Sequence, residues 1–106
     1  MEPIARVTTS TIDVLYALLD HEGTVWGLLV VKSTERAAGT VYPILERLEG
    51  RGWITSTWEE SERSGPRRRL YEFTPDGRAA ATEARAEFRR RQLPERRPSG
   101  RPVSLF

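Results

Sequence analysis

The stretch AAGTVYPILERLEGRGWI, residues 37–54, has the apolar spacing of an amphipathic helix. Four apolar residues recur at positions i, i+3, i+4 and i+7 and so share one helical face: Val41, Ile44, Leu45 and Leu48. Gly39 and Pro43 are unusual there, because proline costs a helix interior about 3 kcal/mol relative to alanine. Near a helix start proline costs less, since the first N–H groups have no helical partner. We therefore predict a helix whose first turns approach another molecule closely.

The composition is that of one small globular domain. The chain has 106 residues, of which 38% are hydrophobic and 30% charged. It contains no cysteine, which excludes a disulfide framework, a thiolate zinc site and a thiol nucleophile. The longest apolar run, VWGLLVV, is far shorter than the ~18 residues of a membrane span, and the N-terminus lacks the apolar region of a signal peptide. These features predict a cytoplasmic protein with no membrane contact.

The charges are distributed unevenly along the chain. The net charge is only +2, and arginine supplies all of the basic residues except Lys32. Arginines cluster in RSGPRRR (residues 63–69) and after residue 88, whereas acidic residues gather at residues 20–22 and 59–62. Local basic clusters on a nearly neutral domain are typical of a protein that binds a polyanion.

Two further helices are expected before the quoted stretch. The segment TTSTIDVLYALLD (residues 8–20) has one apolar helical face, and Ser10 with Asp13 makes a capping box. His21 lies near the end of this helix, where the helix dipole is negative. A second short helix is predicted over residues 25–33 with Trp26, Leu29 and Val30 as its buried face.

After Gly52 the apolar period changes from 3.6 to 2. WITSTWEE and RRLYEFT read as two strands, with Tyr71 and Phe73 on one face and a polar turn between them. Thr74 and Pro75 then have the residue types of an N-cap and a first helical position. The last helix is predicted over residues 75–93, with residues 94–106 as a flexible basic tail.

The predicted order of elements is that of a winged helix-turn-helix in the α+β class. Three helices and a two-stranded wing make up a DNA-binding domain over residues 1–74, and residues 75–93 form a C-terminal dimerisation helix. In this architecture the second helix of the helix-turn-helix enters the major groove and its first residues contact base edges. Small residues at its start would let the backbone approach DNA, and free N–H groups there suit a phosphate.

The chain also resembles the PadR family of bacterial transcriptional regulators. The shared motifs are G-T-V-Y-P, L-x-R-L-E, the Gly-Pro-Arg of the wing and T-P-x-G before the last helix, spread over residues 7–88. The resemblance implies a dimeric repressor of the small subclass, whose last helix contributes to the dimer interface. In some relatives an aromatic or drug-like ligand releases the DNA, so a small hydrophobic effector is an expected partner. The chain departs from the family at Ala37, where a capping Ser or Thr is usual, and at Trp26, where a Tyr is often found.

The expected DNA contacts lie on the quoted helix and on the wing. Thr40 and Tyr42 offer hydroxyls to phosphates or bases, although Thr40 could simply cap the helix and Tyr42 could close the core. Arg47 reaches either a phosphate or only solvent. The complete predicted set is Ala38, Gly39, Thr40, Tyr42, Pro43, Arg47, Arg63, Arg67 and Arg68. Arg69 is left out, because strand alternation places it with Tyr71 and Phe73.

The expected dimer contacts come from the first and last helices: Ile12, Leu15, Leu19, Ala81, Ala84 and Phe88. Trp26 and Phe88 are the candidate ligand-facing aromatics. Trp53 and Trp58 are expected to pack in the core, as large aromatic residues usually do.

Nothing in the sequence indicates an enzyme, a metal site or a cofactor. His21 is the only histidine, and no nucleophile-elbow or phosphate-loop pattern is present. We therefore predict a repressor that binds a near-palindromic double-stranded operator as a homodimer. The alternative is a winged-helix module that binds a partner protein; such a module should present an exposed apolar patch on its helix and hairpin, and we identify none in the sequence. A third reading is a ligand sensor whose DNA affinity is secondary.

Overall fold

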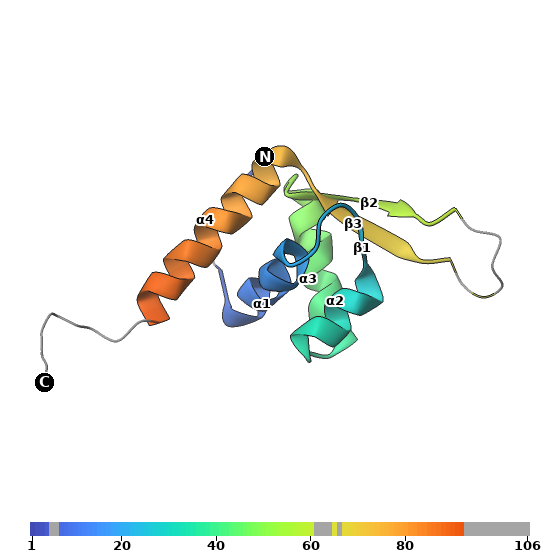
Figure 1. Ribbon diagram of the computed structural model, residues 1–106, viewed down its shortest axis with the longest axis horizontal. Helices are drawn as coiled ribbons and strands as arrows, with labels where there is room; N and C mark the ends of the chain where they lie inside the picture. Colours follow the sequence, from blue (N-terminus) through green and yellow to red (C-terminus); the bar gives the residue numbers. More distant parts are fainter. Residues whose placement is uncertain (5–6, 61–64, 66, 93–106) are drawn as a thin grey trace, which may run out of the picture.

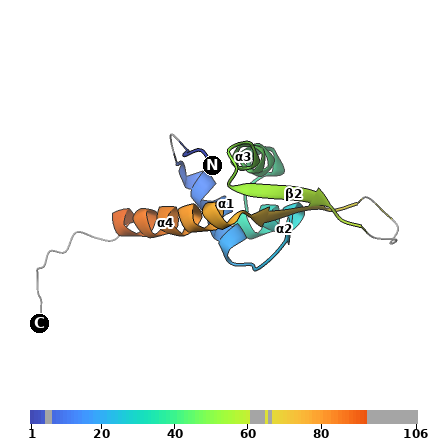
Figure 2. The ribbon, with the colours of Figure 1, turned by 90° about the horizontal axis from the view of Figure 1, so that it is seen from above.

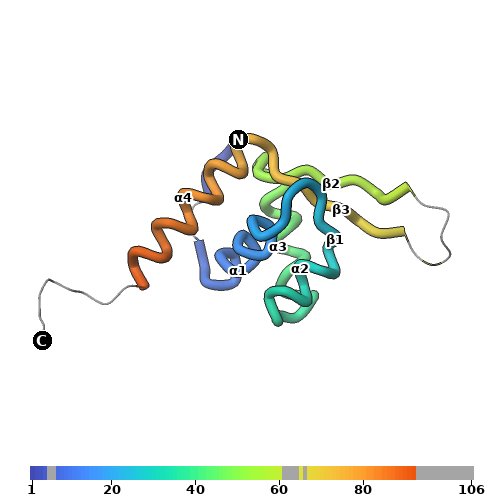
Figure 3. Tube along the Cα trace, viewed as in Figure 1, coloured from blue at the N-terminus to red at the C-terminus, as the bar shows by residue number. Residues whose placement is uncertain are grey.

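The computed structural model describes residues 1–4, 7–60, 65 and 67–92, and these form a winged helix-turn-helix with an additional long helix (Figure 1). The elements in chain order are α1 Thr9–Leu19, β1 Val25–Trp26, α2 Gly27–Thr34, α3 Ala38–Gly50, β2 Ile54–Trp58, β3 Arg69–Phe73 and α4 Pro75–Gln92. The hairpin β2–β3 extends from one side of the three-helix cluster and α4 extends from the other (Figures 1 and 3). The predicted α+β fold class is confirmed. The domain division at residue 74 stays a prediction, and residues 94–106 lie outside the described residues.

Helix α1 begins at a different cap from the predicted one. The Thr11 N–H donates to Thr8 Oγ1 at 3.2 Å, so Thr8 caps the helix and Ser10 lies inside it. Asp13, the other half of the predicted capping box, instead accepts a hydrogen bond from Arg36. At the other end His21 Nδ1 lies 2.9 Å from the Ala17 carbonyl oxygen, which agrees with its expected position at the helix end.

The sheet has a third strand that periodicity did not reveal. Its order is β1-β3-β2, with both pairs antiparallel. Val25 pairs with Tyr71 and Trp26 with Leu70, so these two residues are strand and α2 begins only at Gly27. A two-residue strand has no periodicity of its own and depends on β3 for its hydrogen bonds. The predicted helix start at residue 25 was therefore wrong.

The core lies between the helices and one face of the sheet. The four apolar residues of α3 are all buried, as predicted, together with Ile12, Leu15 and Leu18 of α1. On α2 Val30 is fully buried, whereas Leu29 is exposed, contrary to prediction. Trp53 is buried as expected, but Trp58 is 51% exposed, so its predicted place in the core was wrong.

The start of α4 is fixed to the backbone that follows α3 through Thr74. The Gly77 N–H donates to Thr74 Oγ1 at 2.9 Å, which confirms Thr74 as the N-cap, and the Thr74 hydroxyl donates to the Gly52 carbonyl at 2.9 Å. A Cβ at Gly77 would lie 1.9 Å from the Trp53 carbonyl oxygen, so only glycine fits there. Further along, α4 packs against α1. Within the described part of the chain, no helix has both the length and the apolar character needed to cross a membrane.

Candidate nucleic-acid interface

The start of α3 is an exposed helix N-terminus made of small uncharged residues. Ala37 occupies the N-cap position and has no side chain that could cap the helix. Ala38, Gly39 and Thr40 are exposed, and a Cβ built on Gly39 would meet no atom within 4 Å. Because the first N–H groups of a helix lack helical acceptors, this end can donate hydrogen bonds to an anion.

The turn that leads into α3 is held in place by α1. Glu35 ends α2 in the left-handed conformation, with φ of 59°. The Arg36 N–H donates to Thr34 Oγ1 at 3.2 Å, and the Arg36 side chain donates to Asp13 Oδ2 of α1 at 2.8 Å. Both charged side chains are partly exposed, so this ion pair contributes at most about 1 kcal/mol to stability. Its effect is to position the start of α3. No local sequence pattern links Asp13 to Arg36.

The outward face of α3 carries half of the remaining predicted contacts. Tyr42, Pro43 and Arg47 are exposed, as is Glu46 between them. Tyr42 also packs inward, because a Cβ on Gly27 would lie 3.1 Å from its ring. Tyr42 can therefore both close the edge of the core and offer its hydroxyl to DNA. One side of its ring packs on the start of α2, and the residue is 38% exposed.

A polar groove of about 390 Å³ separates this face of α3 from the sheet. Its lining residues are Tyr42, Pro43, Glu46, Glu49, Arg69 and Tyr71. Arg69 Nη2 donates to Ser56 Oγ at 2.8 Å and lies 3.9 Å from Glu49 Oε1, while Ser56 Oγ donates to Glu49 Oε2 at 2.6 Å. Burial raises the pKa of Tyr71, and the neighbouring Arg69 offsets part of that rise. Arg69, which the sequence reading left out, therefore joins the wing to α3.

The wing arginines do not all point freely into solvent. Arg67 is exposed and its Nε donates to the Glu59 carbonyl at 3.1 Å. The Arg68 guanidinium lies 4.1 Å from the centroid of the Trp26 ring and 3.9 Å from Glu59 Oε2. Arg63 lies outside the described residues. Trp26, a candidate ligand-facing aromatic, is thus covered on one side by a wing arginine.

The predicted dimer residues divide into two groups. Ile12, Leu15 and Ala81 are buried in the chain's own core, so their side chains are not available to a second subunit. Leu19, Ala84 and Phe88 are only partly buried and pack on the outside of that core. Phe88 and Trp26 are not brought together, because Phe88 borders a small cavity between α1 and α4 and Trp26 lies beside the wing.

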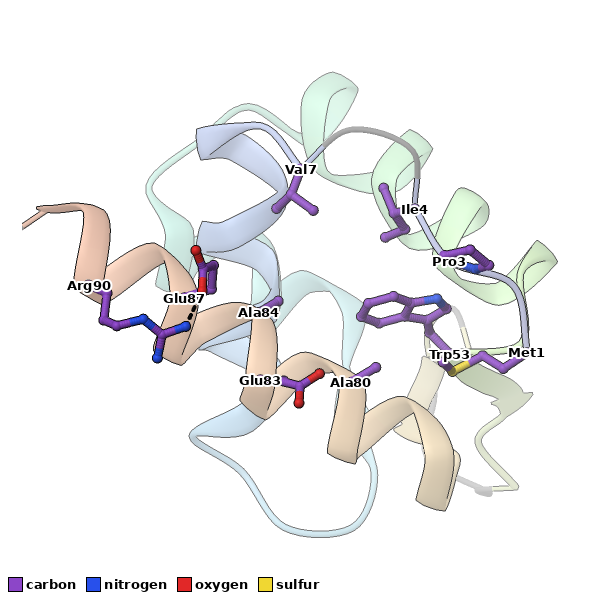
Figure 4. A pocket seen from close by; sticks show the side chains of 10 residues that line it. All are labelled: Met1, Pro3, Ile4, Val7, Trp53, Ala80, Glu83, Ala84, Glu87 and Arg90. Atoms are coloured by element: carbon purple, nitrogen blue, oxygen red, sulfur yellow. Dashed lines mark hydrogen bonds and ion pairs between the residues drawn. The ribbon is translucent and has the colours of Figure 1, made fainter.

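A larger groove of about 620 Å³ lies between the N-terminal residues and α4 (Figure 4). Trp53 lies between these two walls, and its Nε1–H donates to the Glu2 carbonyl at 2.7 Å. Ala80 and Ala84 line the α4 side, with Glu83 and Glu87 at the rim. A hydrogen bond from Arg90 lowers the pKa of Glu87. The sequence reading missed this groove, because its walls come from opposite ends of the chain.

The helix-turn-helix, the wing and the exposed start of α3 define the winged-helix class of proteins. Residues 15–83 match the transcriptional regulator PadR-like family, and the chain belongs to that family. The resemblance seen in the sequence motifs is thereby confirmed. The family is one of transcriptional regulators, and the described residues contain no group of three acidic or histidine side chains that could hold a metal ion.

Individual relatives agree with this assignment. The chain is 51% identical over 47 residues to transcriptional regulator Rv3488 of Mycobacterium tuberculosis; the match covers 44% of this chain and 42% of that protein, less than half the length of each. The structure of Bordetella bronchiseptica BpsR, whose DNA binding is regulated by 6-hydroxynicotinic acid, superposes with a TM-score of 0.65 and 31% identity over 84% of this chain and 59% of that one. A PadR family transcription regulator from Clostridium difficile R20291 has the same fold, with a TM-score of 0.67 and 23% identity over 80% of this chain and 92% of that one.

Proposed function

We propose that this regulator is a repressor that binds a near-palindromic DNA duplex as a homodimer. The observation that carries the proposal is the start of α3, whose first three residues are small, uncharged and exposed and whose N-cap residue has no side-chain cap. This arrangement suits close approach to the major groove with a phosphate at the helix N-terminus. Thr40, Tyr42, Pro43 and Arg47 then face the groove, while Arg67 and Arg68 contact the flanking backbone, as we also propose for Arg63.

For the dimer we propose a contact through α4 and the exposed edge of α1. Helix α4 extends away from the wing (Figure 2), so a partner that packs on it would leave both α3 helices free for DNA. Leu19, Ala84 and Phe88 are the apolar side chains of this contact. Two-fold symmetry then places the α3 helices about 34 Å apart, one turn of the duplex.

We further propose that a small aromatic or hydrophobic effector controls DNA binding. The support is the groove beside Trp53, which offers an apolar lining with carboxylates at its rim, and the regulation of BpsR by a small aromatic acid. The groove lies against the proposed dimer contact on α4. A molecule bound in it would therefore change the orientation of the two subunits relative to each other.

The first test is fluorescence anisotropy with the DNA upstream of the protein's own gene, titrated against a scrambled duplex of equal length. We expect binding that survives about 0.15 M salt and prefers the upstream DNA at least about tenfold. Equal binding to both duplexes that is lost with salt would mean only non-specific attraction.

Binding to neither duplex would favour the second candidate, a module that binds a partner protein. One observation supports that candidate. Contrary to the sequence reading, the surface shared by α3 and the wing does expose aromatic side chains, namely Tyr42 and Trp58. Because the same aromatic surface could serve DNA or a protein, the binding experiment and not the fold decides between them.

A further inference from the structure

We infer that Trp58, the last residue of β2, is a DNA contact of the wing whose indole ring lies against the sugar-phosphate backbone beside the groove that α3 enters. The inference rests on the proposed function, since it adds one contact to the same DNA-binding surface. Three observations carry it: the face of the sheet on which Trp58 lies, the support that its ring receives, and its exposure.

Trp58 lies on the face of the sheet that is turned toward α3. It is paired directly with Arg69 across the antiparallel strands, and directly paired side chains lie on the same face. Ser56 shares this face, because alternate residues of a strand point the same way. Ser56 and Arg69 both contact Glu49 of α3. Trp58 is therefore the next side chain outward on the wing from the point where the wing meets α3.

The indole ring is supported from one side by a fixed cation. The Arg69 guanidinium carbon lies 4.8 Å from the centroid of the Trp58 ring, within the range of a cation–π contact. Arg69 is itself held by its hydrogen bond to Ser56 and its ion pair with Glu49. Glu49 offsets the charge of Arg69. This part of the wing therefore presents an oriented apolar ring to a partner more than it presents a positive charge.

Trp58 is also the most accessible of the three tryptophans. It is 51% exposed, whereas Trp53 is 4% exposed and the ring of Trp26 is partly covered by Arg68. The sugar-phosphate backbone that borders a DNA groove suits both parts of an indole ring. Its apolar surface can pack on deoxyribose, and its single N–H can donate to a phosphate.

Acrylamide quenching of tryptophan fluorescence tests whether DNA covers the ring. Acrylamide is neutral, so it measures access without a charge effect, and the contribution of Trp58 is the difference between the wild type and Trp58→Phe. We expect saturating upstream duplex to reduce this contribution at least about twofold, because a backbone that lies against the ring covers the side that is exposed before binding. Unchanged quenching on a duplex that anisotropy shows to be bound would overturn the inference and leave the proposed function intact.

Affinity and its salt dependence supply the second test. We expect Trp58→Ala to weaken binding about tenfold with the salt slope unchanged, since no charge is removed. Trp58→Phe keeps an aromatic ring and should retain most of the affinity. Thr57→Ala, on the opposite face of the same strand, is the matched control and should bind as the wild type does. Wild-type affinity in Trp58→Ala would overturn the contact. A lower salt slope in that variant would also overturn it, because the loss of affinity would then come from displaced arginines. Absence of any DNA binding by the wild type would remove the proposed function and this inference together.

Discussion

At the scale of single residues, two glycines occupy helix starts for opposite reasons. Around Gly39 there is open space, so nothing in the chain itself prevents a side chain there. At Gly77 a Cβ would overlap the Trp53 carbonyl, so the fold itself requires glycine. Glycine in a helix costs up to about 1 kcal/mol relative to alanine. At Gly77 the close packing explains that cost, and at Gly39 we propose that the approach of DNA explains it.

The substitution Gly39→Ala should therefore separate stability from binding. We expect the free energy of unfolding to rise by about 0.5–1 kcal/mol, while DNA affinity falls about tenfold because the new methyl group stands between α3 and the groove. Urea unfolding and anisotropy measure the two quantities. Gly50→Ala, at the other end of α3 and equally open, is the control and should leave affinity unchanged. If Gly39→Ala bound DNA as tightly as the wild type, the start of α3 would not approach the duplex closely.

The opposite result is expected for Gly77→Ala. The added methyl group must displace either the first turn of α4 or the Trp53 backbone, which should lower the free energy of unfolding by about 1–3 kcal/mol or more. The urea midpoint measures this loss, with Gly50→Ala again as the control. Unchanged stability would mean that α4 can move away from Trp53 without cost.

At the scale of elements, the wing is a hairpin whose two faces have different roles. One face carries Arg69 and Trp58 next to α3, and the other carries Arg68 stacked on Trp26. Among the described residues, Arg67 is exposed and donates to the Glu59 carbonyl, whereas Arg68 is half-buried between Trp26 and the Glu59 carboxylate. We propose that both guanidinium groups contact phosphates.

Replacing Arg67 and Arg68 together by alanine should weaken DNA binding and reduce the slope of log affinity against log salt by about one to two units, because each phosphate contact releases roughly one counterion. The control removes the same charge away from the wing and from the apolar residues of the proposed dimer contact, with Arg51→Ala and Arg78→Ala, whose side chains donate to the Pro3 and His21 carbonyls. The slope is read from anisotropy at several salt concentrations. Equal slopes for both double variants would exclude the wing from the mechanism.

An element could be predicted from the sequence where the residues that determine it lie within one segment, and it was missed where they lie far apart along the chain. The α3 face and the Thr74 cap were predicted because their periodicity and spacing lie within one segment. Strand β1 was missed because it exists only through pairing with β3, far along the chain. The predicted burial of Trp58 was wrong for a related reason. Whether a side chain of the wing is buried depends on whether another element covers that end of the hairpin. The groove beside Trp53 joins the two ends of the chain and left no local signal.

At the scale of the whole molecule, the wing and α4 extend in opposite directions from one core (Figure 1). The proposed DNA-facing surface and the proposed dimer contact are therefore separate, and a change in one can be tested without direct damage to the other. The buried dimer candidates of α1 and α4 contribute to this division, because they hold α4 against the core instead of against a partner.

The variant Ala84→Arg tests the proposed dimer. We expect it to dissociate the dimer, because a charged side chain replaces a small apolar one at the contact, while the neighbouring groove leaves the monomer room to fold. Sedimentation velocity measures the mass, and anisotropy should show a loss of preference for a two-site operator. Ala86→Arg adds the same charge on the exposed opposite face of α4 and should remain dimeric. A dimeric Ala84→Arg protein would place the contact elsewhere.

The attachment of Thr74 to the backbone that follows α3 has a mechanical consequence. It fixes the start of α4, which is about 27 Å long at 1.5 Å per residue, next to the last turn of α3, the helix that we propose to face DNA. In the proposed dimer, a small rotation of one α4 against the partner's α4 would therefore change the spacing between the two α3 helices. We propose that an operator with half-sites at a fixed separation is bound or released by such a change of angle alone, with no residue of the proposed DNA-facing surface altered.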